Sequence, residues 1–368
     1  MKYRVLHIFS SKTAGGAEKK TLFLAESLQK AGICDNIMGV TKGTYMFEQS
    51  AAKGLETVDF KAGGSLDPAG ISRLIRIIGK YDIDIVHAHQ GKLYWQALIA
   101  RFLRAGTKVV FHRRQDTRHG FYSRLHYRFA DAVITVSKAV SEGLIKYEKA
   151  PAEKVFTVYN GLDFDKFDAG AGCGDIIKAY GLEGKRVIGT AGAIVDFKGK
   201  GQIYLIEAAA KLRKDYPDLR YLIVGAGAGM EKQKEYAEHL GVEDIVCFTG
   251  YQEQVHKYIL AMDIFCLLSW DTEGVGNVLI EAQALGKPVI GTGIGGIPET
   301  FIDGKSGILI KPSSADETAA AIRSLLDDPA KAAEFAKAGR EFVRSRFTIE
   351  NMVKATADVY NKIMADKK

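Results

Sequence analysis

The feature that most constrains the fold is an alternation of short apolar runs with helix-length amphipathic segments. Buried parallel strands are near-continuous apolar runs, and each crossover between them requires a helix. The run "YRVLHIF" at 3–9, followed by "GAEKKTLFLAESLQKAG" at 16–32, is the first such unit. Two series of runs follow one another, at 3–9, 84–89, 108–112, 132–137 and 155–161, and at 186–192, 220–227, 245–250, 264–269, 288–293 and 307–310. The pattern predicts an α/β fold of two doubly wound, Rossmann-like domains that face each other across a cleft.

The length of the chain also favours two domains, because 368 residues exceed what one core usually supports. The Gly- and Asp-rich stretch 162–175 has the composition of a linker. We therefore expect an N-terminal domain at 1–168 and a C-terminal domain at 169–347. The helical pattern breaks near Phe347–Thr348, which predicts a last helix at 348–368 that crosses back onto the first domain.

Composition restricts the location and the partners. The N-terminus is too weakly apolar for a signal peptide, and no run approaches the roughly 20 apolar residues of a membrane span. Four scattered cysteines without paired spacing indicate a reduced, cytoplasmic protein. Residues 1–165 hold 25 Lys and Arg against 16 Asp and Glu, a net charge of +9, whereas the remainder holds 26 against 28, a net charge of −2. The first half is thus expected to face an anionic partner.

The basic charge is densest at 101–128, which holds eight Lys and Arg and one acid. Aromatic residues are interleaved with them, namely Phe102, Phe111, Phe121, Tyr122 and Tyr127. Such a face suits an anionic membrane surface, with peripheral attachment to the inner face of the plasma membrane. RNA stacking and a merely solvated basic surface are the alternatives. No recognised nucleic-acid module occurs, so nucleic acid is not an expected partner.

The stretch "TEGVGNVLIEAQALGKPVIGT" at 272–292 contains two acids, Glu273 and Glu281, around the start of a predicted helix near Asn277. Carboxylates accept hydrogen bonds from hydroxyls, while the N–H groups of a first helical turn favour phosphate. Gly276 lets a ligand approach the backbone between Val275 and Val278. A nucleotide sugar fits this combination, with Glu273 on the sugar, the helix start on the diphosphate and Glu281 on the ribose. The alternative is two ordinary surface acids.

Other candidates lie after strands. Lys198 and Lys200 follow the strand that ends near Gly192, where a cation would stabilise a leaving diphosphate; solvated lysines are the alternative. His112 ends the run "KVVFH", and Tyr251 follows a strand where it could border a base or simply pack. "GAGAGM" at 225–230 has Met230 in place of the third glycine of a dinucleotide motif, so we interpret it as a turn. No metal-ligand spacing is present, and a metal-independent protein without cofactor is expected.

These residues resemble retaining glycosyltransferases of family 4, which have the GT-B fold. The similarity runs nearly end to end and is most specific in "EGVGNVLIEAQALGKPVIGT" followed by "GGIPE"; "GGAEKKTLFLAESL", "ADAVITVS" and "NGLDFDKF" also resemble family segments. The resemblance implies that the second domain holds an NDP-sugar and the first an acceptor. It also implies that Gly15 and Gly16 form a donor-facing loop and that His112 lines the sugar pocket.

The chain departs from the family at Ala193, where an arginine is usual. The Lys-Gly pair that normally follows occurs twice in "FKGKGQ". Spacing from Gly192 favours Lys198, whereas the following "QIYLIEA" favours Lys200, which we prefer.

The resulting hypothesis is a retaining hexosyltransferase that moves a sugar from an NDP-sugar to a lipid-linked or phosphorylated saccharide, in lipopolysaccharide or other envelope glycan synthesis. A soluble sugar synthase of the same fold is the alternative enzyme. A nucleotide-sugar-binding protein without turnover is a further alternative, suggested by Ala193.

Overall fold

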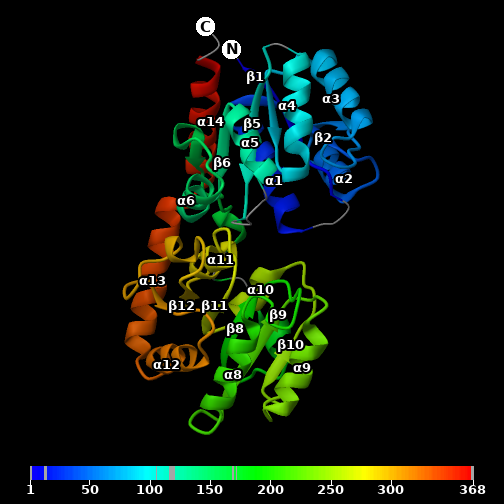
Figure 1. The fold of residues 1–368 in the computed structure, drawn as a ribbon. Helices are drawn as coiled ribbons and strands as arrows, with labels where there is room; N and C mark the ends of the chain where they lie inside the picture. The colour runs from blue at the N-terminus through cyan, green and yellow to red at the C-terminus, as the bar shows by residue number, and fades with distance from the viewer. Residues whose placement is uncertain are drawn as a thin grey trace. The chain divides into compact units, whose positions relative to one another are not determined.

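The computed structural model describes residues 2–11, 15–104, 106–115, 121–167, 170 and 172–365. The chain divides into two compact units, Met1–Gly161 with Ile349–Lys368, and Leu162–Thr348. Each unit is a parallel sheet covered by helices on both faces, and each is described by itself (Figure 1). The α/β class and the pair of Rossmann-like units predicted from the apolar runs are therefore confirmed.

The first unit contains a seven-stranded sheet in the order β3-β2-β1-β4-β5-β6-β7. Its strands are β1 (Tyr3–Ile8), β2 (Cys34–Val40), β3 (Glu56–Asp59), β4 (Ile85–Ala88), β5 (Lys108–Arg113), β6 (Ala132–Thr135) and β7 (Val155–Thr157). Its helices are α1 (Gly16–Lys30), α2 (Tyr45–Ala52), α3 (Pro68–Tyr81), α4 (Tyr94–Leu103), α5 (Phe121–Phe129), α6 (Lys138–Tyr147) and α14 (Ile349–Ala365), with 3-10 turns η1 (Gly91–Leu93) and η2 (Ala152–Lys154).

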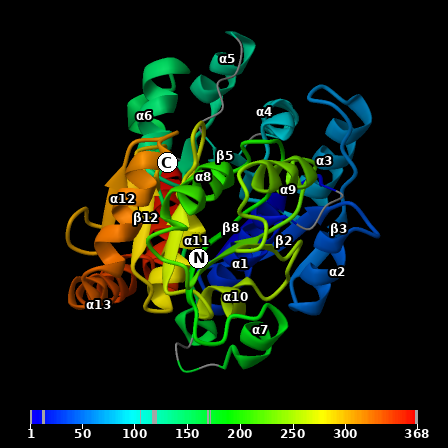
Figure 2. The ribbon, with the colours of Figure 1, turned by 90° about the horizontal axis from the view of Figure 1, so that it is seen from below.

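Side chains that alternate along these strands fill two separate apolar layers. On one face, Leu6 and Val86 pack with residues of α3 and α4. On the other face, Val5 and Ile85 pack with residues of α1 and α14. Figure 2 shows β2 and β3 lying between α3 and α2, as expected for a sheet with helices on both sides.

The last helix, α14, belongs to the first unit although its residues end the chain (red in Figure 1). Met352, Val353 and Tyr360 pack into the same apolar cluster as Leu24 and Leu28 of α1. The first unit is thus built from both ends of the sequence.

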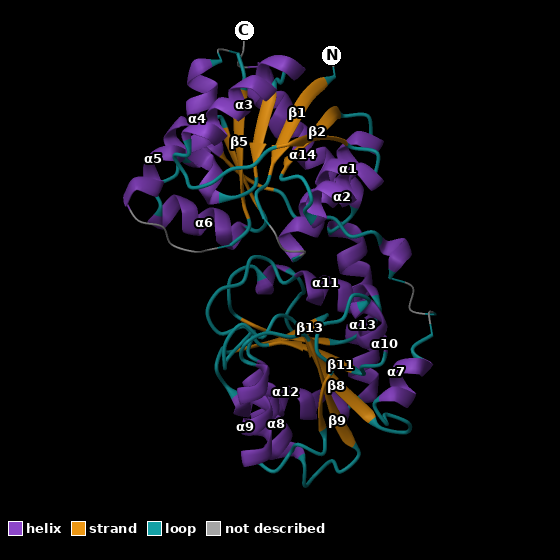
Figure 3. Cartoon of the chain, turned by 90° about the vertical axis from the view of Figure 1, so that its right-hand side faces the viewer, coloured by secondary structure: helices purple, strands orange, loops and turns teal. Residues whose placement is uncertain are grey.

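The second unit contains a six-stranded sheet in the order β10-β9-β8-β11-β12-β13. Its strands are β8 (Arg186–Ala191), β9 (Leu219–Val224), β10 (Val246–Phe248), β11 (Ile264–Leu267), β12 (Val289–Thr292) and β13 (Gly307–Ile310). Its helices are α7 (Gly174–Ala179), α8 (Gln202–Leu212), α9 (Met230–His239), α10 (Val255–Leu260), α11 (Asn277–Ala284), α12 (Ala315–Leu326) and α13 (Pro329–Arg346), with 3-10 turns η3 (Phe164–Lys166) and η4 (Ile297–Glu299). Figure 3 shows the strands in orange between the helices in purple.

The structure differs from the predicted organisation of the chain at one boundary and in two strands. The first unit ends at Gly161, earlier than the predicted residue 168, because the Leu162 N–H already donates to the Phe347 carbonyl of the second unit, 2.8 Å away. The pattern of apolar runs also does not predict β2 and β3. Asp, Asn and Gly interrupt the apolar run of β2, and β3 is a half-exposed edge strand.

In the part of the chain that the structure describes, every helix is too short or too polar to cross a lipid bilayer.

Candidate functional site

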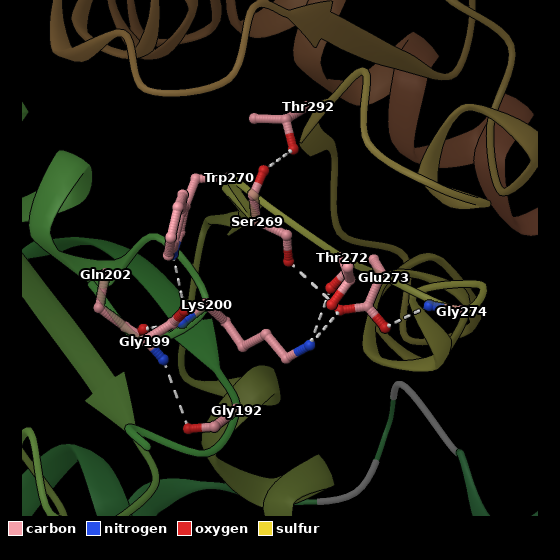
Figure 4. Close-up of polar contacts among 10 residues, drawn as sticks. All are labelled: Gly192, Gly199, Lys200, Gln202, Ser269, Trp270, Thr272, Glu273, Gly274 and Thr292. Carbon is pink, nitrogen blue, oxygen red and sulfur yellow. Dashed lines mark hydrogen bonds and ion pairs between the residues drawn. The ribbon is translucent and has the colours of Figure 1, made fainter. Parts of the chain in front are cut away.

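Two strand-end loops of the second unit come together around an ion pair. The loop after β8 carries Lys200, and the loop after β11 carries Glu273. Because β8 and β11 are neighbouring parallel strands, their carboxyl ends lie at the same edge of the sheet. Lys200 Nζ lies 3.0 Å from Glu273 Oε2, and the two side chains keep 29% and 18% of their surface exposed (Figure 4). A cation and an anion are thus placed where ligands bind in this class of fold.

Hydrogen bonds fix the Glu273 carboxylate in position. Ser269 Oγ donates to Oε2 at 3.2 Å, and the Gly274 N–H donates to Oε1 at 3.2 Å (Figure 4). Lys200 Nζ also donates to the Thr272 carbonyl at 3.3 Å. A carboxylate has about four acceptor positions, so Glu273 can accept further hydrogen bonds from a ligand.

The turn after β12 contacts the backbone of the Glu273 loop. The Gly296 N–H donates to the Glu273 carbonyl at 3.3 Å, and Thr292 Oγ1 donates to the Ser269 carbonyl at 2.6 Å. Gly295 has a φ of +53°, and a Cβ there would overlap with the Glu273 carbonyl oxygen. This contact gives residues 293–296 a structural role as a turn that positions the Glu273 loop.

Lys198 and Lys200 have different surroundings. Lys198 is exposed, and its Nζ lies 4.3 Å from the centroid of the Trp270 ring, a cation–π contact. Trp270 Nε1 in turn donates to the Gly199 carbonyl at 3.2 Å (Figure 4). Only Lys200 is paired with Glu273 in the described residues.

The start of α8 anchors the lysine loop. Gln202 Oε1 accepts from the Lys200 N–H at 2.6 Å, and its Nε2 donates to the Gly192 carbonyl at 3.4 Å. A Cβ at Gly192 would lie 3.3 Å from Lys200 Cγ. The structure therefore brings Gly192, Lys200 and Glu273 together.

The "GAGAGM" glycines have a packing role against the same loop. A Cβ at Gly225, Gly227 or Gly229 would overlap with the carbonyl oxygen of Gly192, Ile194 or Asp196, respectively. The backbone of this turn thus lies directly against the loop after β8. This packing accounts for the glycines without a dinucleotide.

The other predicted donor residues surround the start of α11 and the end of β10. Gly276, with a φ of +76°, is the residue before α11, so Asn277 and Val278 form its first turn, and Val275 is buried. Glu281 lies one turn further along α11 and is half-buried. Tyr251 is 66% exposed, and the preceding Gly250 carbonyl accepts from the Gly225 N–H at 2.9 Å.

In the first unit, His112 is buried near the end of β5 within a group of four histidines. His7, His87 and His89 complete the group, at the ends of β1 and β4. His112 Nδ1 lies 3.2 Å from His87 Nε2, and His7 Nδ1 lies 2.9 Å from His89 Nε2. The sequence predicts a role for His112 alone, although all four histidines lie near the ends of apolar runs. That shared position was the available signal.

The histidine group is electrically neutral at physiological pH. Burial lowers the pKa of His7 from 6.5 to about 4, although its hydrogen bond to Asn36 opposes the shift. Burial likewise holds the pKa of His87, His89 and His112 well below the usual value, and the nearby Arg114 guanidinium lowers them further.

A metal ion does not fit this group well. One ring nitrogen each of His7, His87 and His89 lies within 4.8 Å of the others, a spacing that a metal could use. However, His89 Nδ1 is 3.5 Å from the Arg114 guanidinium, a donor that requires an acceptor there and whose charge repels a cation. A hydrogen-bonded neutral cluster suits these residues better.

The predicted loop of Gly15 and Gly16 lies only partly within the described residues, because 12–14 fall outside them. Gly15 is the extended N-cap of α1, and a Cβ there would lie 2.8 Å from Glu18 Oε2. A Cβ at Gly16 would meet no atom within 4 Å among the described residues. Close packing accounts for neither glycine, because the atoms beside Gly15 belong to the end of the flexible Glu18 side chain.

Two family profiles match the two units separately. Residues 14–166 match the profile described as Glycosyltransferase Family 4, and residues 175–342 match the profile described as Glycosyl transferases group 1.

Similar proteins of known name cover most of the chain. The GDP-mannose-dependent alpha-(1-6)-phosphatidylinositol monomannoside mannosyltransferase of Mycolicibacterium smegmatis is 30% identical over 82% of this chain and 83% of its own length. The putative glycosyltransferase EpsD of Bacillus subtilis is 28% identical over 81% of this chain and 82% of its own.

Solved structures agree with the fold. A glycosyltransferase from Rickettsia africae superposes with a TM-score of 0.90 at 23% identity and covers 99% of both chains. The Anabaena protein Alr3699/HepE in complex with UDP has a TM-score of 0.87 at 22% identity, covering 98% of this chain and 100% of that one.

Proposed function

Because the chain belongs to glycosyltransferase family 4 and is an enzyme with the GT-B fold, we propose that it transfers a sugar from an NDP-sugar, with retention of configuration, to a lipid-linked or phosphorylated saccharide. The single observation that carries the proposal is the Lys200–Glu273 ion pair at the carboxyl edge of the second sheet. Glu273 lies four residues before the start of α11. The pair supplies a cation for phosphate and an acceptor for hydroxyls at one place.

In this proposal the second unit binds the donor. Glu273 accepts hydrogen bonds from the transferred sugar, and Glu281 accepts from the ribose. Lys200 and the backbone at Val275–Val278 hold the diphosphate, with Lys198 as a second, more exposed cation. Gly192 gives the ligand room beside Lys200, and Tyr251 borders the base. We also propose that His112 and the Gly15–Gly16 loop bind the sugar.

The proposed chemistry is a substitution on one face of the sugar. The bond from the anomeric carbon to the diphosphate oxygen breaks, and the bond to the acceptor oxygen forms on the same face. The departing phosphate oxygen takes the acceptor's proton. The Lys200 ammonium stabilises the charge that grows on the diphosphate, which is the largest electrostatic demand of the step. Since the chain itself provides this charge, we expect turnover to persist in a metal chelator.

The acceptor proposal rests on the surface of the first unit. Phe102, Leu103, Leu125 and Phe129 are exposed at the adjoining ends of α4 and α5, and the Phe102 and Phe129 rings lie 6.0 Å apart. Arg104 and Arg128 are exposed beside them. Apolar side chains with basic neighbours suit the headgroup region of an anionic membrane. We propose attachment there, at the cytoplasmic face, where lipid-linked envelope glycans such as lipopolysaccharide core would be acceptors.

Part of the basic and aromatic segment at 101–128 has a different role from the expected one. Phe111 and Tyr127 are completely buried and belong to the core, so they do not face a membrane. Arg101 and Lys108 both pair with Asp131, at 3.1 and 3.3 Å. The membrane proposal is therefore limited to the exposed residues of α4 and α5.

The proposal is tested with a panel of UDP- and GDP-sugars. The Mycolicibacterium relative is named as GDP-mannose-dependent and the Anabaena structure contains UDP, so both bases are included. We expect one nucleotide sugar to raise the unfolding temperature and to be consumed when a lipid-linked acceptor is added. Consumption with a soluble sugar phosphate alone would favour a sugar synthase, and the absence of both binding and turnover across the panel would contradict the proposal.

A further inference from the structure

The four buried histidines of the first unit form two hydrogen-bonded chains whose proton positions can be worked out. The first chain begins at Asn36, whose side-chain NH₂ donates to the Ala25 carbonyl at 2.8 Å. A carbonyl can only accept, so Asn36 Oδ1 must face His7 Nε2, 2.8 Å away, and accept from it. Neutral His7 therefore has a bare Nδ1, which accepts from His89 Nε2. His89 Nδ1 then accepts from Arg114.

The second chain begins at Tyr360 of α14. Its hydroxyl lies 2.7 Å from His87 Nδ1, across a sequence separation of 273 residues. Tyr360 is completely buried, and burial holds its pKa well above the usual value, so the phenol stays protonated. His87 is the hydrogen-bond partner of this hydroxyl among the residues that the structure describes. The O–H therefore donates to His87 Nδ1.

The direction of the Tyr360–His87 hydrogen bond determines the tautomer of His112. With Nδ1 accepting, neutral His87 carries its hydrogen on Nε2 and donates to His112 Nδ1 at 3.2 Å. Neutral His112 then carries its own hydrogen on Nε2. The opposite direction would leave the buried Tyr360 hydroxyl hydrogen without an acceptor, which costs about 1–3 kcal/mol.

The second hydrogen-bonded chain of side chains ends at His112 Nε2. His112 Nε2 is buried and has no hydrogen-bond partner among the described residues. The residue is held in place from the other side, because Tyr94 donates its hydroxyl hydrogen to the His112 carbonyl at 2.8 Å. A buried donor without a partner is costly unless a ligand supplies the acceptor.

We propose that Tyr360 is a positioning residue which, through His87, fixes His112 as the Nε2–H tautomer, so that His112 donates a hydrogen bond to an oxygen of the sugar ligand. The identity of the ligand rests on the function proposed above, whereas the tautomer rests on the contacts alone. The last helix of the chain thereby sets the hydrogen-bonding character of a residue on the fifth strand. A neutral imidazole in this form selects an acceptor oxygen and discriminates against a ligand group that can only donate.

The tautomer is measured directly by nitrogen NMR of protein labelled at histidine, since protonated and bare ring nitrogens have well-separated shifts. In the wild type we expect His112 to have a protonated Nε2 and a bare Nδ1 near neutral pH. In Tyr360→Phe, which keeps the packing and removes the hydroxyl, we expect both tautomers of His112 to be populated. A His112 with protonated Nδ1 in the wild type, or an unchanged spectrum in Tyr360→Phe, would overturn the proposal.

Tyr3→Phe is the matched control, because the Tyr3 hydroxyl also bonds to α14, through Asn361 at 3.1 Å, and this bond is not part of either histidine network in the described residues. It should leave the His112 nitrogen shifts unchanged. With a donor that is turned over, Tyr360→Phe should lower kcat/KM about tenfold while the Kd of the nucleoside diphosphate, which lacks the sugar, stays the same. Equal losses in Tyr3→Phe and Tyr360→Phe would argue for a merely structural role. If no sugar is transferred at all, the proposed function fails, and the NMR result still decides the tautomer.

Discussion

At the scale of single residues, the Lys200–Glu273 ion pair is only partly buried, which limits what it can contribute to the stability of the fold. Exposed or half-exposed pairs contribute at most about 1 kcal/mol to stability, because solvent screens the attraction and the side chains lose entropy. The same two groups contribute far more when a bound ligand excludes water and charge develops beside them. Replacing either residue should therefore affect turnover much more than folding.

We predict that Glu273→Gln lowers kcat by about 100-fold or more, because the neutral amide no longer compensates Lys200 or accepts strongly from the sugar. The unfolding free energy should change by no more than about 1 kcal/mol. Steady-state kinetics and denaturant unfolding check the two values. Lys198→Met is the comparison, with a smaller expected loss because Lys198 lies over Trp270 and not against Glu273. A kcat near the wild-type value in Glu273→Gln would show that Glu273 does not take part in the reaction.

At the scale of structural elements, the glycine turns act as spacers that set the strand-end loops. The turn after β12 contacts the Glu273 carbonyl, and the turn after β9 contacts the loop after β8. In both places a Cβ would strike backbone, which cannot rotate away as a side chain can. The position of the ion pair therefore depends on residues that do not take part in it.

We predict that Gly295→Ala displaces the Glu273 loop and weakens donor binding by about tenfold or more, since the residue combines a positive φ with the overlap at Glu273. Gly293→Ala is the matched control in the same loop, because a Cβ there meets no described atom within 4 Å. Calorimetric titration with the active nucleotide sugar gives the two affinities. Equal affinities in the two variants would show that the turn does not position Glu273.

At the scale of the whole molecule, each sheet has its own core, and the first one is completed by the last helix of the chain. The buried histidines and Arg114 make the first unit sensitive to acid. The pKa of His7 is lowered to about 4 by burial, so the folded state stays neutral where the unfolded chain takes up a proton. Its contribution to stability is full above about pH 6.5 and is lost as the pH falls from there towards 4.

We predict that the unfolding free energy of the first unit decreases between about pH 6.5 and pH 5, by up to about 1.4 kcal/mol per pH unit for each histidine that stays neutral. Denaturant titrations over this range measure the slope. His7→Gln should make the slope shallower, because folding then prevents the protonation of one histidine fewer. The same change at the exposed His239 of α9 should leave it unaltered. A slope that His7→Gln does not alter would show that His7 is not kept neutral by folding.

We also predict that the first unit attaches to anionic vesicles through the ends of α4 and α5. The double variant Phe102→Ser, Leu103→Ser should bind about tenfold or more weakly, because inserting each side chain contributes on the order of 1–3 kcal/mol. Ile302→Ser is the control, since Ile302 is also an exposed apolar residue but belongs to the second unit, with 44% of its surface exposed against 65% for Phe102 and 64% for Leu103. Sedimentation with anionic and with neutral vesicles gives the comparison, and equal binding of all three proteins would contradict the proposal.

Much of the fold could be predicted from the sequence because buried parallel strands are apolar all along their length. All six strands of the second unit coincide with predicted runs. Strand β2, which the apolar pattern does not predict, shows the limit of this signal. Its Asn36 is polar and yet buried, because it accepts a hydrogen bond from His7 on the neighbouring strand, and no local pattern reports that partner.

The sequence by itself determined the α/β class, the two series of strands apart from β2 and β3, and the ends of strands near which Lys200, Glu273 and His112 lie. Only the tertiary structure decided that Lys200 and not Lys198 pairs with Glu273, that Gly295 supports that pair, and that Tyr360 bonds to His87. The reason is physical. Periodicity records which side chains of one segment avoid water, whereas a hydrogen bond or an ion pair depends on where two distant segments meet.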